Sequence, residues 1–228
     1  QERFGTVDER SLKLRFHAQT AGVSLTAQQP YNNVVRTALQ ALAAVIGGAN
    51  SLHTNSLDEA LALPTREAAL LALRTQQVIA HESGLTDVVD PFGGSYFLER
   101  MTLDLQEGAR GYFAEIDRFG GMVEAIEEGY PQREIAESAY KFQQAVESGK
   151  QTIIGVNEHT QQSTMDIPIL QIDDSVEERQ VAEIQKLREK RDSSLVEQVL
   201  DELRCAAVGN ENVMPLLLKA VRAYSTVG

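Results

Sequence analysis

The feature that most constrains the fold is a unit of short extended segment, polar loop and apolar helix, which occurs twice in succession. In the first unit, residues 12–17 (LKLRFH) alternate apolar and polar side chains, which is the pattern of a strand with two different faces. Gly22 then frees the backbone for a turn. Pro30 suits the first position of a helix that the apolar spacing predicts over residues 31–46.

A second unit of the same kind follows. Residues 50–54 (NSLHT) form the short extended segment, and Ser56 and Glu59 have the spacing of a capping box for a helical turn. Pro64 then opens a helix predicted to end near Ser83. Strands that alternate with helices favour the α/β class, with a parallel sheet or a barrel, over a helical bundle.

The loop of the first unit is rich in uncharged hydrogen-bonding side chains. They are Gln19, Thr20, Ser24, Thr26, Gln28 and Gln29. In barrels and doubly wound α/β folds, ligands bind at the carboxyl ends of the strands, just before the following helices. We therefore expect a ligand at this loop. Glu59, in the second loop, either caps its helix or accepts a hydrogen bond from a ligand hydroxyl.

The rest of the chain is predicted to be mainly helical, with two more short strands. The strands are expected within residues 87–96 (DVVDPFGGSY) and 150–156 (KQTIIGV). The helices are expected at residues 97–117, 122–128, 133–148, 175–204 with a break near Asp192, and 212–224. Gly93 and Gly94 form either a tight turn, which we favour, or a backbone cradle for a phosphate.

Composition excludes several classes of function. The 228 residues carry a formal net charge of -12, which argues against a nucleic-acid or anionic-membrane surface. The single cysteine, Cys205, excludes an intrachain disulfide and fits a reducing compartment, so we expect a cytoplasmic protein with no nucleic-acid or membrane partner. The histidines show no metal-ligand spacing, and the P-loop, Gly-x-Gly-x-x-Gly and His-Glu-x-x-His motifs are absent, so no metal site is predicted.

Three long motifs, in a fixed order, carry a resemblance to a known family. They are RFHAQTAGVSLTAQQPYNNVVR at residues 15–36, NSLHTNSLDEALALPT at 50–65, and ESG with VDPFGGSY at 82–84 and 89–96. Over residues 11–157 the chain closely resembles the large, catalytic subunit of coenzyme B12-dependent methylmalonyl-CoA mutase and its acyl-CoA mutase relatives.

This resemblance implies a fold and a set of partners. In the family, a (β/α)8 TIM barrel binds the acyl-CoA substrate, and adenosylcobalamin lies across the carboxyl ends of the strands, against a separate B12-binding domain. Residues 1–157 are therefore expected to be the C-terminal part of the TIM barrel with its following helices, and residues 158–228 a helical C-terminal extension. The N-terminal half of the barrel and the B12-binding domain or small subunit are expected as partners, in an oligomer.

The resemblance also assigns cofactor-binding residues one by one. The matching positions are Gln19, Gly22, Asn50, Asn55, Glu59 and Ala62. Gln19 and Glu59 would face the adenosyl ribose, whereas Gly22 and Ala62 would leave room for the flat corrin. No residue is assigned as catalytic or as a metal ligand. Val23 stands where mitochondrial-type enzymes usually have tryptophan, which suggests a prokaryotic form.

The implied activity is a radical carbon-skeleton isomerisation that interconverts (R)-methylmalonyl-CoA and succinyl-CoA. Sister mutases that act on isobutyryl-, ethylmalonyl- or 2-hydroxyisobutyryl-CoA stay open, because the determinants of acyl choice lie in the barrel half that the sequence lacks. A non-catalytic interpretation also stays open. Without that half and the B12-binding domain, the chain alone is expected to be inactive and only to bind partner segments.

Overall fold

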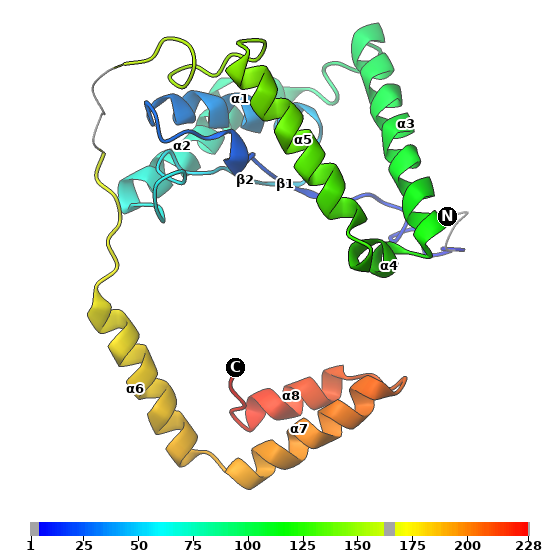
Figure 1. The fold of residues 1–228 in the computed structure, drawn as a ribbon, viewed down its shortest axis with the longest axis vertical. Helices are drawn as coiled ribbons and strands as arrows, with labels where there is room; N and C mark the ends of the chain where they lie inside the picture. Colours follow the sequence, from blue (N-terminus) through cyan, green and yellow to red (C-terminus); the bar gives the residue numbers. More distant parts are fainter. Residues whose placement is uncertain (1–4, 162–166, 228) are drawn as a thin grey trace. The chain divides into compact units, whose positions relative to one another are not determined.

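Two short parallel strands organise the first part of the chain. β1 (His17–Gln19) pairs with β2 (Ser51–His53) in parallel, with Gln19 opposite His53. The intervening helix α1 (Asn32–Ile46) makes a strand–helix–strand crossover, drawn in blue in Figure 1. This pairing confirms the expected parallel α/β unit.

The computed structural model describes residues 5–161 and 167–227. The chain separates into two units, residues 1–170 and residues 171–228. The first unit holds the strand pair and the helices α1 to α5, and the second holds α6 to α8.

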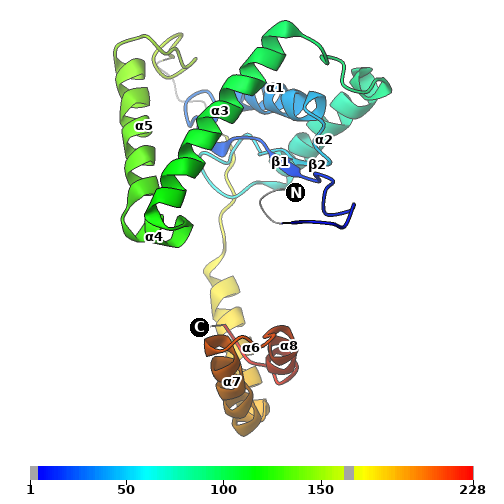
Figure 2. The ribbon, with the colours of Figure 1, turned by 90° about the vertical axis from the view of Figure 1, so that its right-hand side faces the viewer.

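The two faces of the strand pair differ in character. One face carries exposed polar side chains, from His17, Gln19, Ser51 and His53. Within this face, Nδ1 of His17 lies 2.8 Å from Oγ of Ser51. Helices α1 and α2 (Arg66–Glu82) cover the other face, where Leu52 is half-buried (Figures 1 and 2). The helices thus leave a polar sheet face open.

Helix boundaries follow the start and stop signals in the sequence. Pro30 begins a turn that leads into α1, since the N–H of Asn33 donates to the carbonyl of Pro30 at 3.0 Å. Gly48, with a φ of 78°, follows the end of this helix. In α2, the side chain of Thr65 accepts a hydrogen bond from the N–H of Ala68 and caps the first turn.

Asn33 of α1 is a fully buried polar side chain that holds both loops that leave the strands. Its Nδ2 donates to the carbonyls of Thr26 and Leu57, both at 2.9 Å. Its Oδ1 accepts from the N–H of Thr26 at 3.1 Å and from Arg36 at 2.8 Å. Because every polar atom of this amide is used, α1 fixes both loops relative to the strand pair.

The first strand is shorter than the alternating pattern predicts, and it begins later in the sequence. It was expected over residues 12–17 and covers only His17–Gln19, because β2 offers partners to these three residues alone. Leu12 and Leu14 are exposed, and the chain around them forms turns and irregular backbone. An alternating run therefore does not form a strand where no partner strand lies beside it.

The strand expected within residues 87–96 does not form. Residues 85–87 make a short 3-10 helix, η2 (Leu85–Asp87), and Val89 is 98% exposed, so the apolar run is not part of a buried sheet. The N–H of Gly93 donates to the carbonyl of Asp90 at 3.0 Å, in the tight turn that the sequence favoured over a phosphate cradle.

Residues 150–156 also form turns in place of the expected strand, with one isolated bridge between Ile154 and Glu158. Gly155 has a φ of 84°, and Asn157 accepts a hydrogen bond from the N–H of Ile153 at 2.7 Å, which bends the chain. Arg36 of α1 donates to the carbonyl of Ile154 at 2.8 Å and ties this turn to the first helix.

Three helices follow the second unit of strand and helix, and two glycines separate the first two of them. The helices are α3 (Tyr96–Phe119), α4 (Met122–Glu127) and α5 (Tyr130–Glu147). Gly120, with a φ of 100°, ends α3. α4 contacts both of its neighbours, and the rings of Phe119 and Tyr130 lie 5.3 Å apart across this junction.

Residues 171–227 form a separate helical unit. Its helices are α6 (Asp174–Lys190), α7 (Ser193–Val208) and α8 (Met214–Arg222). The side chain of Asp192 accepts from the N–H of Leu195 at 3.0 Å and caps α7, which confirms the predicted break near Asp192. α7 and α8 pack against each other with Val199 and Ala220 buried. None of the helices in the described parts of the chain combines the length and apolar character that a membrane crossing requires.

Replacement of Asn33 by alanine tests whether this buried amide holds the two loops. We expect Asn33→Ala to lower the free energy of unfolding by about 3 kcal/mol, because the carbonyls of Thr26 and Leu57 would stay buried without donors. Urea denaturation of the full-length protein measures this loss. Asn32→Ala is the control, since Asn32 is half-buried and bonds to Gln29 of its own turn. Equal losses in both variants would contradict the role given to Asn33.

Candidate functional site

The two strands end side by side, and polar side chains meet at their carboxyl ends. Gln19 is the last residue of β1, and Asn55 follows β2 closely. Oδ1 of Asn55 accepts hydrogen bonds from the hydroxyl of Thr20 at 3.0 Å and from Nε2 of Gln19 at 3.4 Å. Asn55 is only 2% exposed, whereas Gln19 lies at the surface. Side chains therefore join the two strand ends beyond the backbone ladder.

Asn55 also reaches the acidic residue of the second loop. Its Nδ2 donates to Oε1 of Glu59 at 3.0 Å, and its backbone N–H donates to the hydroxyl of Thr20 at 2.9 Å. We call Gln19, Thr20, Asn55 and Glu59 the strand-exit cluster. Its two exposed members, Gln19 and Glu59, each keep one side-chain oxygen that bonds to no group in the described part of the protein.

Gly22 allows the backbone of the first loop to approach this cluster. A Cβ atom at Gly22 would lie 2.7 Å from Oε1 of Glu59 and 2.9 Å from Nδ2 of Asn55, which is closer than van der Waals contact permits. Any other residue would therefore displace the amide–carboxylate pair or the turn η1 (Gly22–Ser24).

Gln40 of α1 fixes the turn that contains Gly22. Its Oε1 accepts a hydrogen bond from the N–H of Ala21 at 2.6 Å, and its Nε2 donates to Oγ of Ser24 at 2.7 Å. Sequence reasoning missed this residue, because one amide among the apolar positions of a helix is also typical of a solvated helix face. The contact becomes visible only once α1 is packed beside the loop.

A cavity of about 640 Å³ lies beside the cluster. Glu59, Ala62 and His53 line it together with apolar side chains that include Leu63 and Leu73. A wall with a carboxylate and small and apolar residues suits a ligand that combines hydroxyl groups with a broad apolar surface.

Asn50 lies apart from the other predicted site residues. It precedes β2 and therefore stands at the amino ends of the strands, and its Oδ1 accepts a hydrogen bond from the N–H of Phe16 at 3.0 Å. The structure brings the remaining residues to one place, with Gln19, Gly22, Asn55 and Glu59 in contact and Ala62 on the adjoining cavity.

The Ser-x-x-Glu pattern in the second loop does not act as a capping box. Glu59 directs its carboxylate to Asn55, and its N–H donates to the carbonyl of Ser56 at 3.3 Å within a turn. The next helix begins only at Arg66. Of the two interpretations of Glu59, helix capping is thus excluded, and the carboxylate is available to a ligand.

The cluster is chemically suited to bind hydroxyl and amide groups. Amides offer both donors and acceptors, and a carboxylate accepts two or more hydrogen bonds from hydroxyls. Within residues 5–161 and 167–227, no group of three or more His, Cys, Asp or Glu side chains is placed to hold a metal ion.

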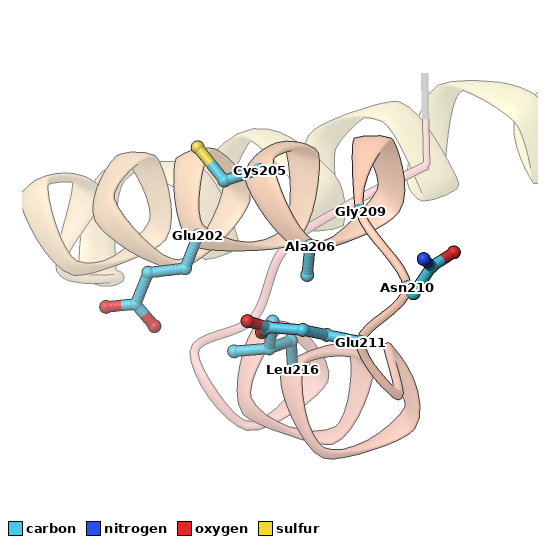
Figure 3. A pocket seen from close by; sticks show the side chains of 7 residues that line it. All are labelled: Glu202, Cys205, Ala206, Gly209, Asn210, Glu211 and Leu216. Carbon is cyan, nitrogen blue, oxygen red and sulfur yellow. The ribbon is translucent and has the colours of Figure 1, made fainter.

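Other cavities lie away from the strand-exit cluster, and two of them are large. A groove of about 930 Å³ lies between Val23 and the helices α3 to α5 and is lined mainly by apolar side chains such as Ile135 and Phe142. The second, of about 470 Å³, lies between α7 and α8 (Figure 3). Figure 3 shows the thiol of Cys205 pointing away from it.

The hydrogen bond from Lys219 lowers the pKa of the Glu202 carboxyl from its ordinary value.

Comparison with known proteins decides the family. The sequence profile of the methylmalonyl-CoA mutase family matches residues 1–228. The chain belongs to this family. Similar proteins include the mitochondrial methylmalonyl-CoA mutase of Mus musculus, with 45% identity over 230 residues, and the methylmalonyl-CoA mutase of Rhizobium meliloti (strain 1021), with 47% identity over 220 residues. The 2-hydroxyisobutanoyl-CoA mutase large subunit of Aquincola tertiaricarbonis is 44% identical over 230 residues. The resemblance carried by the three motifs is thereby confirmed.

The chain spans only part of the length of these relatives. The match to the mouse protein covers 100% of this chain and 31% of the mouse protein. The match to the R. meliloti protein covers 96% of this chain and 31% of that protein. The match to the A. tertiaricarbonis large subunit covers 100% of this chain and 41% of that subunit.

Replacement of Gly22 by alanine tests the close approach at the cluster. We expect Gly22→Ala to break the 3.0 Å bond between Asn55 and Glu59, because the added methyl group needs the same space. A crystal structure of the full-length variant measures this change. Gly108→Ala in α3 is the control, since its Cβ meets nothing within 4 Å, and it should raise stability by about 0.5–1 kcal/mol. An intact Asn55–Glu59 bond in Gly22→Ala would refute the steric explanation.

Proposed function

We propose that this chain is part of an adenosylcobalamin-dependent acyl-CoA mutase and that the strand-exit cluster binds the adenosyl group of the cofactor. Membership of the methylmalonyl-CoA mutase family supports the activity. The observation that carries the proposal is the contact of Gln19, Asn55 and Glu59 beside Gly22, since four of the residues that the motifs assign to the cofactor form one structure.

The residues present fit such a ligand. Glu59 and Gln19 each offer an oxygen atom to the hydroxyls of a ribose, and Asn55 holds both side chains from below the surface. Gly22 and Ala62 leave space beside them for a flat macrocycle, and the cavity next to Glu59 has largely apolar neighbours. Asn50 stands at the opposite ends of the strands, so the proposal does not include it.

Adenosylcobalamin, when bound, supplies the radical that removes a hydrogen atom from the substrate and later returns it. The task of this chain is to hold the ribose and to exclude water. Glu59 and Gln19 orient the sugar by hydrogen bonds, and Asn55 keeps them from turning away. This orientation lowers the barrier of the reaction, because a ligand that is already held in place loses less entropy when the transition state forms.

We propose, further, that residues 1–157 are the C-terminal part of a (β/α)8 TIM barrel and that residues 158–228 are a helical extension. Two parallel strands with a polar open face, and helices on the other face, suit a sheet that continues into further strands. The remainder of the barrel and a B12-binding domain or small subunit would then be partner segments or chains, in an oligomer in the cytoplasm.

The proposed reaction interconverts (R)-methylmalonyl-CoA and succinyl-CoA. Relatives named methylmalonyl-CoA mutase support this substrate, with 45% and 47% identity. A relative named 2-hydroxyisobutanoyl-CoA mutase is 44% identical, so identity separates the two acyl groups by little. The family resemblance implies that the N-terminal half of the barrel selects the acyl group, and assay of the full-length enzyme with both thioesters distinguishes the substrates.

Removal of the two ribose-facing side chains tests the proposed function. In the full-length enzyme, Gln19→Ala and Glu59→Ala should each lower kcat by about 10- to 100-fold while the KM for the acyl-CoA changes less than about threefold. The reason is that both residues contact the cofactor and not the thioester. Steady-state kinetics at saturating adenosylcobalamin measure both constants.

Gln28→Ala is the matched control for this experiment. Gln28 belongs to the same loop as Gln19, is exposed, and makes no side-chain hydrogen bond in the described part of the chain. It should keep the wild-type kcat. Wild-type turnover in Gln19→Ala and in Glu59→Ala would show that the assigned roles are wrong.

A further inference from the structure

Thr20 is a buried member of the strand-exit cluster and has almost no surface of its own for a ligand, with 5% exposed. Its N–H donates to the carbonyl of His53 at 3.1 Å, which extends the strand ladder and fixes the backbone. Its hydroxyl accepts from the N–H of Asn55 at 2.9 Å and donates to Oδ1 of Asn55 at 3.0 Å. The hydroxyl of Thr20 therefore acts both as a donor and as an acceptor to the same residue, Asn55.

This double contact restricts the side chain of Asn55 to one orientation. With Oδ1 held by Thr20, Nδ2 faces Glu59, whose carboxylate oxygen accepts its hydrogen bond. In the reversed orientation, Oδ1 of Asn55 would face that carboxylate, and two acceptors would meet without a proton between them. Thr20 and Glu59 thus hold the amide from two sides.

The orientation of Asn55 sets the orientation of the exposed side chains. Glu59 uses Oε1 for Asn55 and keeps Oε2 for a ligand, and Gln19 uses Nε2 for Asn55 and keeps Oε1. If Asn55 could rotate, both exposed side chains would lose the contact that limits their own rotamers, at a cost in binding entropy.

We propose that Thr20 is a positioning residue of the adenosyl site, which acts only through Asn55 and holds Glu59 and Gln19 ready for the ribose hydroxyls. This inference rests on the proposed function of the cluster. It assigns to a buried hydroxyl that bonds only to Asn55 a selective effect on binding of the adenosyl group.

Equilibrium binding of two cobalamins tests the inference in the full-length enzyme with its B12-binding domain or small subunit. Adenosylcobalamin carries the adenosyl ribose, and hydroxocobalamin has the same corrin and the same lower nucleotide but no adenosyl group. Thr20→Val keeps the side-chain shape and removes the hydroxyl. We expect the Kd of adenosylcobalamin to rise about tenfold and that of hydroxocobalamin to change less than about twofold. Thr20→Ser, which restores the hydroxyl, should return the ratio of the two Kd values to that of the wild type.

Thr75→Val is the control. Thr75 is a half-buried residue of α2, and its hydroxyl donates to the carbonyl of Leu71 at 3.0 Å within the same helix. Loss of this hydroxyl should leave the ratio of the two Kd values unchanged. Where Thr20→Val does not fold, Thr20→Ala removes the same hydroxyl with less bulk and should give the same shift in ratio.

An unchanged Kd ratio in the folded Thr20 variant, or an equal rise for both cobalamins, would overturn the positioning role. Glu59→Ala separates this failure from failure of the proposed function. If Glu59→Ala raises the ratio and the Thr20 variant does not, only the inference about Thr20 falls. If neither variant changes the ratio, the adenosyl site itself is wrong.

Discussion

The hydrogen bonds between Thr20 and Asn55 are the interaction on which the candidate site depends. The backbone ladder of β1 and β2 ends at the carboxyl ends of the strands, and beyond it the two loops would be free to move apart. A buried hydroxyl and a buried amide continue the pairing by two further bonds, at 2.9 Å and 3.0 Å. Because both groups are buried and bond to each other, separation of the loops would break two buried hydrogen bonds at once, so the cluster keeps its shape before any ligand arrives.

Local signals predicted the helices well, because a helix start or stop depends on residues within one turn. Pro30 and Asp192 act in this way. Strands depend on a partner that lies elsewhere in the chain, and the sequence gives no sign of whether the partner exists. The runs at residues 87–96 and 150–156 have the composition of strands, yet they form turns, with Val89 almost fully exposed.

The sequence predicted most of the residues of the site but not the contacts between them. The motifs placed Gln19 and Gly22 in one loop and Glu59 in another, but their contact depends on the register that sets Gln19 opposite His53. Asn50 precedes β2 and therefore lies at the opposite ends of the strands from the other assigned residues, a separation that the motifs alone do not reveal. The sequence did not predict which residues of α1 hold the loops, because amides and arginines on a helix are also typical of a solvated surface.

The dependence of both loops on α1 has a consequence for inherited or engineered defects in proteins that contain this segment. Asn33, Arg36 and Gln40 are not members of the strand-exit cluster, yet they hold the loops that carry it. A lesion among them would lower the fraction of molecules with a closed, competent site without removing any direct contact. The defect would appear as a weaker apparent affinity of the whole site, and a higher ligand concentration would offset part of it by mass action.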